Sequence, residues 1–213
     1  MGTLARVPNA ETHISFALLQ DTRLTFATKM LMCWLMRFTR AKSVDAMKPT
    51  YYSCKRLARS LRISVPTVST GIDQLETVGY FVVDRDAREY TPVFSKSEWI
   101  RKLHGNRAGS LFFKIQDEWL EGLSLSEAAV LGLITQMCSG SKGKRWVQNN
   151  RILEELLGLS EATIVRKINK LRGAGWLQYA KTHGRSCIYE VARPSENQNS
   201  TDGGEVVKLQ AYR

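Results

Sequence analysis

The feature that most constrains the fold is an internal repeat in the sequence. The segment LARSLRISVPTVSTGIDQLETVGYF (57–81) aligns without a gap with LEELLGLSEATIVRKINKLRGAGWL (153–177), at an offset of 153 − 57 = 96 residues. The matched pairs include Leu57 with Leu153, Leu61 with Leu157, Ser64 with Ser160, Val68 with Ile164, Ile72 with Ile168, Leu75 with Leu171 and Gly79 with Gly175. Because self-similarity of this kind indicates a duplicated structural unit, the fold is expected to contain one unit twice.

Each copy predicts two helices joined by a tight turn. In the second copy, Ile164, Ile168, Leu171 and Ala174 recur at helical spacing and form a stripe that is expected to face the core. Ser160 stands where an N-cap would be, and Gly175 follows as the stop. Taken alone, this pattern describes an ordinary amphipathic helix.

The turn between the two helices needs a left-handed residue. Gly158 suits that position in the second copy, because glycine adopts positive φ without a steric penalty. Arg62 occupies it in the first copy, where some strain is expected but the turn is retained.

The similarity extends on both sides of the repeat. Residues 23–35 match 122–134 at an offset of 99, with Thr25 and Ser124 as N-caps. Residues 80–93 and 176–191 each read strand, turn, strand, which predicts two β-hairpins. Each half is therefore expected to contain helix, short strand or loop, helix, tight turn, helix and hairpin. The fold class is mainly α with small β-hairpin wings (α+β).

These patterns divide the chain into four parts. We expect a first domain with an N-terminal arm (1–94), a basic linker with a short helix (95–110) and a second domain (111–192). The tail, 193–213, is polar and rich in helix breakers, so it is expected to be disordered.

Composition limits the classes of function. With 31 Lys and Arg against 20 Asp and Glu, the formal charge is +11, which favours a polyanionic partner such as nucleic acid or an anionic membrane surface.

No apolar run is long enough to span a membrane, and the first residues lack the apolar stretch of a secretory signal. Four isolated cysteines, without a C-x-x-C pair or nearby histidine partners, favour neither structural zinc nor a disulfide framework and predict a cytoplasmic protein. No cofactor is expected. The three histidines have no acid or thiol at a telling spacing, and no phosphate-cradling loop or nucleophile elbow is present, so no enzyme is predicted.

The exposed face of the third helix is the candidate DNA-binding surface. A helix fits the major groove of B-DNA, where each base pair presents a distinct pattern of donors and acceptors. Arg166 suits guanine, Asn169 suits adenine and Lys170 can reach a phosphate. The other candidates in the second copy are Thr163, Arg151 and the wing residues Lys181, His183 and Arg185, and those in the first copy are Lys55, Arg56, Pro66, Thr67, Ser69, Thr70, Gln74, Arg85 and Arg88. A solvated helix face is the alternative for any one of them.

The two third helices are not equally suited to reading bases. The first copy presents short hydroxyls, Gln74 and the acidic Asp73, and Gly71 weakens that helix by about 1 kcal/mol relative to alanine. The second copy is therefore the expected base reader. The first binds phosphates, reads fewer bases or mediates a homodimer.

Both copies carry the motif L-x-x-x-L-x-[IL]-S-x-x-T-[VI]-x-x-x-I-x-x-L-x-x-x-G-[YW], which resembles the winged helix-turn-helix DNA-binding superfamily. Two tandem copies in one chain are similar in layout to plasmid and phage replication initiators. That resemblance implies a double-stranded DNA partner, repeated origin sites and autoregulation. A transcriptional repressor binding an operator stays open. So does a protein-binding adaptor with tandem winged helices, although such adaptors tend to be acidic and this chain is basic.

Overall fold

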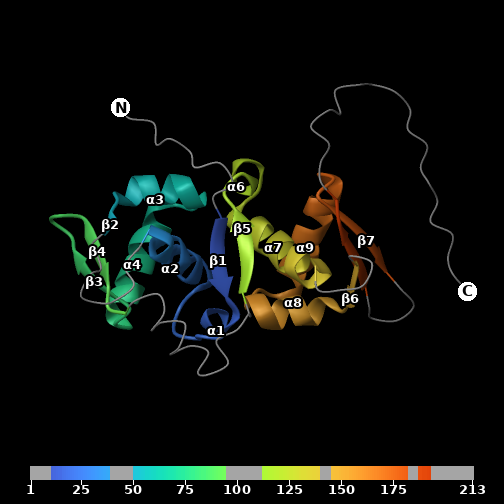
Figure 1. Ribbon diagram of the computed structural model, residues 1–213, viewed down its shortest axis with the longest axis horizontal. Helices are drawn as coiled ribbons and strands as arrows, with labels where there is room; N and C mark the ends of the chain where they lie inside the picture. Colours follow the sequence, from blue (N-terminus) through green and yellow to red (C-terminus); the bar gives the residue numbers. More distant parts are fainter. Residues whose placement is uncertain (1–10, 39–49, 95–111, 140–144, 182–186, 193–213) are drawn as a thin grey trace, which may run out of the picture.

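The computed structural model describes residues 11–38, 50–94, 112–139, 145–181 and 187–192. Within these residues the molecule is a mixed α and β structure, in which helices pack against small antiparallel sheets. Figure 1 shows a two-stranded ribbon at the centre, a helical half on either side of it and a three-stranded sheet at each end. The predicted α+β class is confirmed.

The first half contains the predicted order of elements. Its helices are α1 (Phe16–Leu19), α2 (Phe26–Phe38), α3 (Cys54–Leu61) and α4 (Val65–Thr77). Its strands β2 (Thr50–Tyr51), β3 (Phe81–Asp84) and β4 (Glu89–Pro92) form an antiparallel sheet in the order β2-β4-β3. Strands β3 and β4 are the predicted hairpin, and α2 packs against α4 through a stripe of buried apolar side chains.

The second half repeats this order. Its helices are α6 (Trp119–Gly122), α7 (Leu125–Ser139), α8 (Asn150–Leu157) and α9 (Glu161–Gly173). Its strands β6 (Arg145–Gln148), β7 (Leu177–Lys181) and β8 (Cys187–Val191) pair in the order β6-β8-β7, which is the topology of the first sheet. Helices α8 and α9 lie 96 residues after α3 and α4, as the repeat predicts.

The caps and turns of the repeat are formed as expected. The Ser64 hydroxyl accepts a hydrogen bond from the Thr67 amide, and Ser160 does the same for Thr163. Arg62 and Gly158 both adopt the left-handed conformation, with φ of 52° and 64°. For Arg62 this costs about 1 kcal/mol or more, because its Cβ crowds the backbone there.

One residue of the predicted apolar stripe is not buried. Ala174 lies just after the last residue of α9 and is exposed, so its expected place in the core is wrong. Gly175 ends the helix with φ of 74°, and the chain turns away before the stripe makes another contact.

The two halves meet in a ribbon that the sequence did not indicate. Strands β1 (Glu11–Ser15) and β5 (Phe112–Gln116) pair antiparallel, with Glu11 opposite Gln116, His13 opposite Lys114 and Ser15 opposite Phe112. Residues assigned to an N-terminal arm thus form half of a shared sheet. A symmetric antiparallel pair has a local two-fold axis perpendicular to the sheet, which passes here between His13 and Lys114.

That local axis relates the halves of the molecule approximately. Each strand of the ribbon leads into a one-turn helix and then a long buried helix, β1 into α1 and α2, and β5 into α6 and α7. In Figure 1, α3 lies above the ribbon on one side and α8 below it on the other, while α6 and α1 lie at opposite ends of the ribbon. A rotation of half a turn in the plane of the picture exchanges these elements.

Contacts across this axis hold the halves together. The Arg37 guanidinium at the end of α2 lies 2.6 Å from the Asp117 carboxylate after β5 and also donates to the Thr12 hydroxyl. Arg62 donates to the carbonyls of Leu120 and Glu121 on α6. On the other side of the axis, α1 packs against α8. The one-turn helix of each half therefore contacts the other half: α6 contacts Arg62, in the turn after α3, and α1 contacts α8.

Two of the four predicted parts fall outside the described residues. The linker lies within 95–111, and the tail is 193–213. Among the described residues, no helix is both long and apolar enough to cross a membrane.

Candidate nucleic-acid interface

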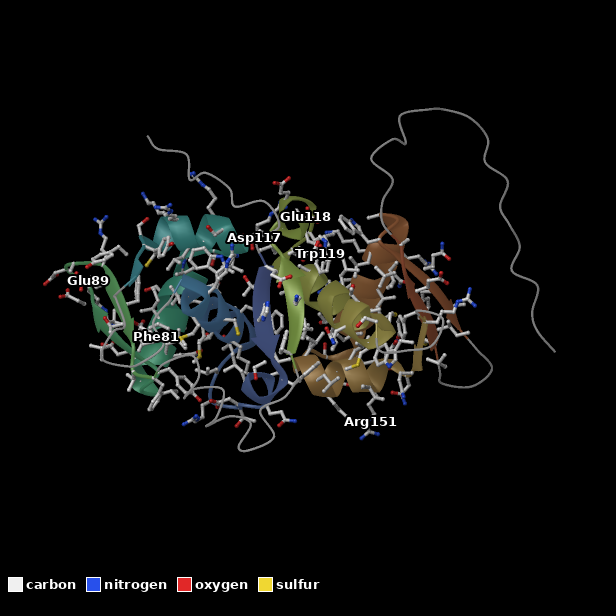
Figure 2. The ribbon with its side chains drawn as sticks, in the orientation of Figure 1. Phe81, Glu89, Asp117, Glu118, Trp119 and Arg151 are labelled. Carbon is white, nitrogen blue, oxygen red and sulfur yellow. The ribbon has the colours of Figure 1, made fainter. Side chains whose placement is uncertain are left out.

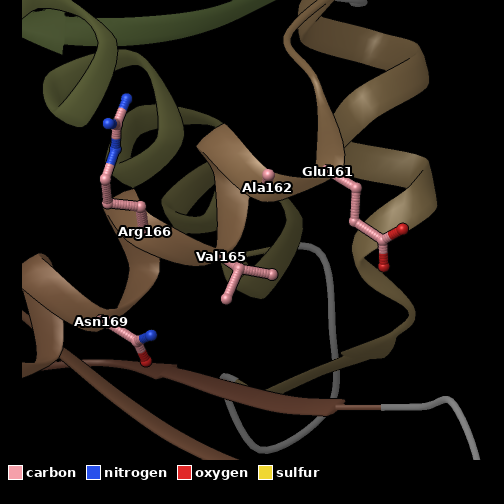
Figure 3. Close-up of a pocket in the computed structure, with 5 residues that line it drawn as sticks. All are labelled: Glu161, Ala162, Val165, Arg166 and Asn169. Atoms are coloured by element: carbon pink, nitrogen blue, oxygen red, sulfur yellow. The ribbon is translucent and has the colours of Figure 1, made fainter.

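Helix α9 presents an exposed strip opposite the side that it buries. Its buried side chains are Ile164, Ile168 and Leu171, at 0–1% exposure, so the opposite surface faces solvent. A shallow hollow runs along that surface and is lined by Glu161, Ala162, Val165, Arg166 and Asn169 (Figure 3). In this view Val165 lies between Asn169 and Glu161, and Arg166, the next residue in the helix, extends away from Val165.

The two predicted base-reading residues lie on the exposed strip of α9. Within the described part of the chain, neither Arg166 nor Asn169 makes a hydrogen bond or ion pair. Both are exposed, and the strip places them three residues apart on adjacent turns. The guanidinium and the carboxamide therefore keep their full hydrogen-bonding capacity for a ligand.

Lys170, the predicted phosphate contact, is held by a buried acid. Its ammonium lies 3.0 Å from Oε1 of Glu127 on α7, and Lys167 lies at the same distance from that oxygen. The Glu127 side chain has no exposed surface, whereas Lys170 is 65% exposed. Burial would raise the pKa of Glu127, but the Ser124 amide, Lys170 and Lys167 outweigh it and lower that pKa to about 2. Lys170 thus remains accessible to solvent, although its ammonium already pairs with Glu127.

On the equivalent surface of α4 the predicted contacts are Gln74 and four short side chains. Pro66, Ser69 and Thr70 are exposed, while Thr67 is half-buried and its hydroxyl contacts that of Ser64, 2.7 Å away. Gln74 turns toward α2, where its carbonyl oxygen accepts from the Thr25 amide and the Thr28 hydroxyl. Pro66, Ser69 and Thr70 therefore face solvent, whereas Thr67 belongs to the helix cap and Gln74 to the contact with α2.

Gly71 has a packing role in α4. A Cβ built there would lie 3.0 Å from Cδ2 of Leu31 and 3.3 Å from the Thr28 hydroxyl. The glycine lets α4 approach α2 closely, which gives a reason for a residue that otherwise weakens the helix.

The first hairpin directs one predicted arginine back to its own helix. Arg85 lies 2.8 Å from Asp73 and 2.7 Å from Glu76, both on α4, and the hydrogen bonds to these acids raise its pKa. Arg88 is exposed at the hairpin turn with φ of 58°. In the second hairpin, Lys181 is the last residue of β7, and His183 and Arg185 lie outside the described residues.

Helices α3 and α8 carry different charges on equivalent surfaces. Lys55 and Arg56 are exposed on α3, with the Arg56 guanidinium 5.1 Å from the centre of the Tyr52 ring. Arg151 projects from α8 into solvent (Figure 2) but pairs with Glu155 at 3.0 Å. Free basic charge in this pair of helices is therefore concentrated on α3.

The sequence analysis missed two exposed basic residues, one on α3 and one on α9. Arg59 is four residues after Lys55 and extends the basic side of α3, and Arg172 lies in the last turn of α9. The helical spacing of Arg59 from Lys55 is a signal that would have found it, because residues four apart share one side of a helix.

The described residues contain no group of three or more His, Cys, Asp or Glu side chains that could hold a metal ion. The chain matches no known protein family, no curated protein and no solved structure.

Proposed function

We propose that this chain is a sequence-specific double-stranded DNA-binding protein of the cytoplasm. In this proposal the domains 1–94 and 111–192 are two tandem winged helix-turn-helix domains, and α9 is the principal base-reading helix. The duplicated order of three helices and an antiparallel hairpin, with a short third strand, supports that assignment.

The observation that carries the proposal is the exposed strip of α9. Arg166 and Asn169 are the side chains best suited to bidentate bonds with guanine and adenine, and neither is used inside the described structure. Behind them Ile164, Ile168 and Leu171 are buried, so the helix is fixed while Arg166 and Asn169 are presented to solvent. A strip that served only solubility would have no need of this pairing of residue types.

Phosphate contacts would come from neighbouring helices. Lys55, Arg56 and Arg59 lie on α3, which contains no acidic residue, and Lys170 lies beside the base-reading strip. Neutralising phosphates releases counterions, so affinity is expected to fall steeply as salt is raised.

The internal two-fold axis favours a binding site with two inverted halves. If α4 and α9 contact one duplex together, the axis between them must coincide with a dyad of the DNA. Because α4 and α9 expose different side chains, the two half-sites would differ in sequence. One chain would then recognise an imperfect inverted repeat without forming a dimer.

We further propose a role in replication initiation of the plasmid or phage type, with repression of the chain's own operon. A chain that carries a complete two-part site is suited to occupying each copy of a repeated origin sequence separately. A homodimer through the first domain would instead suit an operator.

The test is selection of bound duplexes from a random pool by the full-length chain, followed by binding measurements at increasing salt. We expect one site of about two major-groove segments and an affinity that falls by orders of magnitude between about 50 and 200 mM salt. Failure to enrich any sequence, with affinity insensitive to salt, would remove DNA binding as the function. Recovery of a tight protein partner in that case would favour the adaptor.

A further inference from the structure

We propose that α9 also reads the 5-methyl group of a thymine, through an apolar contact made by Val165 and Ala162. This inference rests on the proposed function and specifies which bases the strip recognises. It concerns the hollow of Figure 3, whose floor is apolar while Arg166 and Asn169 lie along its edge.

The apolar residues stand out against the rest of the exposed helix. Val165 is 38% exposed, and Ala162 is exposed one turn before it. The other exposed side chains of α9 are polar or charged: Glu161, Arg166, Asn169, Lys170 and Arg172. In the equivalent positions of α4 the residues are Ser69 and Pro66, so the repeated fold itself does not require a valine there.

Only one apolar group is presented by the bases in the major groove, and it is the C5 methyl of thymine. Apolar groups such as alanine, the methyl of threonine and phenylalanine are the usual contacts of that methyl. Val165 lies directly beside Arg166 in the chain and four residues before Asn169. A base pair contacted by Val165 would therefore adjoin the pairs contacted by Arg166 and Asn169.

Helix dimensions limit where the thymine can lie. From Ala162 to Asn169 the helix rises about 10 Å, at about 1.5 Å per residue. Base pairs are spaced about 3.4 Å apart, so this length of helix spans about three of them. The thymine is expected within the same three base pairs as the guanine and adenine.

The experiment uses the full chain and its selected duplex, with each thymine replaced in turn by deoxyuridine. Deoxyuridine keeps every hydrogen-bonding group of thymine and removes only the methyl. We expect one replacement in the α9 half-site to weaken binding about fourfold, the value for withdrawing one buried methyl from an apolar contact. In the Val165→Ser variant, which copies the residue of α4, the same replacement should have little effect.

The control is Val65→Ser, which removes the exposed valine at the start of α4. Val65 is 40% exposed, similar to Val165, so its removal tests for a general loss of apolar surface. We expect this variant to keep the fourfold thymine effect.

Three results would overturn the inference. They are equal binding of all deoxyuridine duplexes, an effect that persists in Val165→Ser, and a selected half-site without thymine. In each case sequence-selective binding itself would stand. Absence of any selected duplex would instead remove the proposed function and this inference together.

Discussion

The same junction is built from different chemistry in the two halves of the molecule. The junction is the place where α4 crosses the start of α2, and where α9 crosses the start of α7 in the second half. In the first half it is made by the neutral residues Thr28 and Gln74, which share a hydrogen bond of 2.6 Å. The second half places Glu127 and Lys170 at the equivalent positions, joined by an ion pair of 3.0 Å. Lys167 stands where the first half has Gly71, and it adds a second ammonium to the same carboxylate.

This difference shows how one fold supports two surfaces. A buried carboxylate on α7 holds two lysines at the edge of α9, so the second junction brings positive charge to the side that we propose reads bases. The neutral first junction leaves α4 without basic residues, and its acids Asp73 and Glu76 are paired with Arg85. Basic charge in the first half lies on α3 instead.

The largest expected effect comes from removing the buried acid. Glu127→Gln should destabilise the folded chain by about 3 kcal/mol at pH 7, because it leaves two lysines beside a buried site without their counter-charge. The pKa of Glu127 is lowered from 4.5 to about 2, so the ionised carboxylate contributes fully to the free energy of unfolding above about pH 5. That contribution is lost as pH falls from about 5 to about 2. Chemical unfolding followed at several pH values measures both effects.

The matched change in the first half is Thr28→Val. It breaks the neutral hydrogen bonds of the Thr28 hydroxyl with Gln74 and with the Thr25 hydroxyl, and it should cost about 1–2 kcal/mol with no dependence on pH between 2 and 5. The chain contains five tryptophans, so variants that keep only Trp34, in the first half, or only Trp146, in the second, separate the two transitions by fluorescence. A pH-independent loss in Glu127→Gln would show that the ion pairs do not stabilise the second half.

The next effect concerns base reading. Arg166→Ala should weaken binding to the selected duplex by about 1–3 kcal/mol and relax preference at one base pair. Thr70→Ala, at the equivalent position of α4, should change affinity much less because a single hydroxyl is lost. Competition binding against duplexes with each base pair altered measures both variants. Equal losses on specific and random duplexes would place Arg166 on the phosphates.

Local patterns in the sequence predicted the local parts of this structure. The helices within each copy of the repeat, the caps Ser64 and Ser160 and the left-handed turn at Arg62 all depend on residues within a few positions of one another. The antiparallel pairing of β1 with β5 joins residues about 100 positions apart, and no pattern in either segment indicates its partner.

The candidate site divides along the same line. Helical position alone placed Gln74 on the exposed side of α4, and it placed Lys170 on the exposed side of α9 with Arg166 and Asn169. Their hydrogen-bonding partners, Thr28 and Glu127, lie on another helix more than 40 residues earlier in the chain. Which way a side chain at the edge of a helix turns depends on how closely the two helices approach, and a single helical pattern does not contain that distance.

The smallest expected effect compares the two equivalent basic residues at the starts of α3 and α8. Lys55→Ala should weaken binding to all duplexes alike and reduce the slope of log affinity against log salt by about 0.9, the value for one phosphate contact. Arg151→Ala should reduce that slope less, because Glu155 already neutralises part of its charge at 3.0 Å. Both side chains are exposed, so neither change should alter the free energy of unfolding by more than about 0.5 kcal/mol. Titrations of one duplex at four or more salt concentrations measure the slopes. A larger change in slope for Arg151→Ala than for Lys55→Ala would mean that DNA displaces Glu155 from Arg151. The contrast between a basic α3 and a neutralised α8 would then hold only in the free protein.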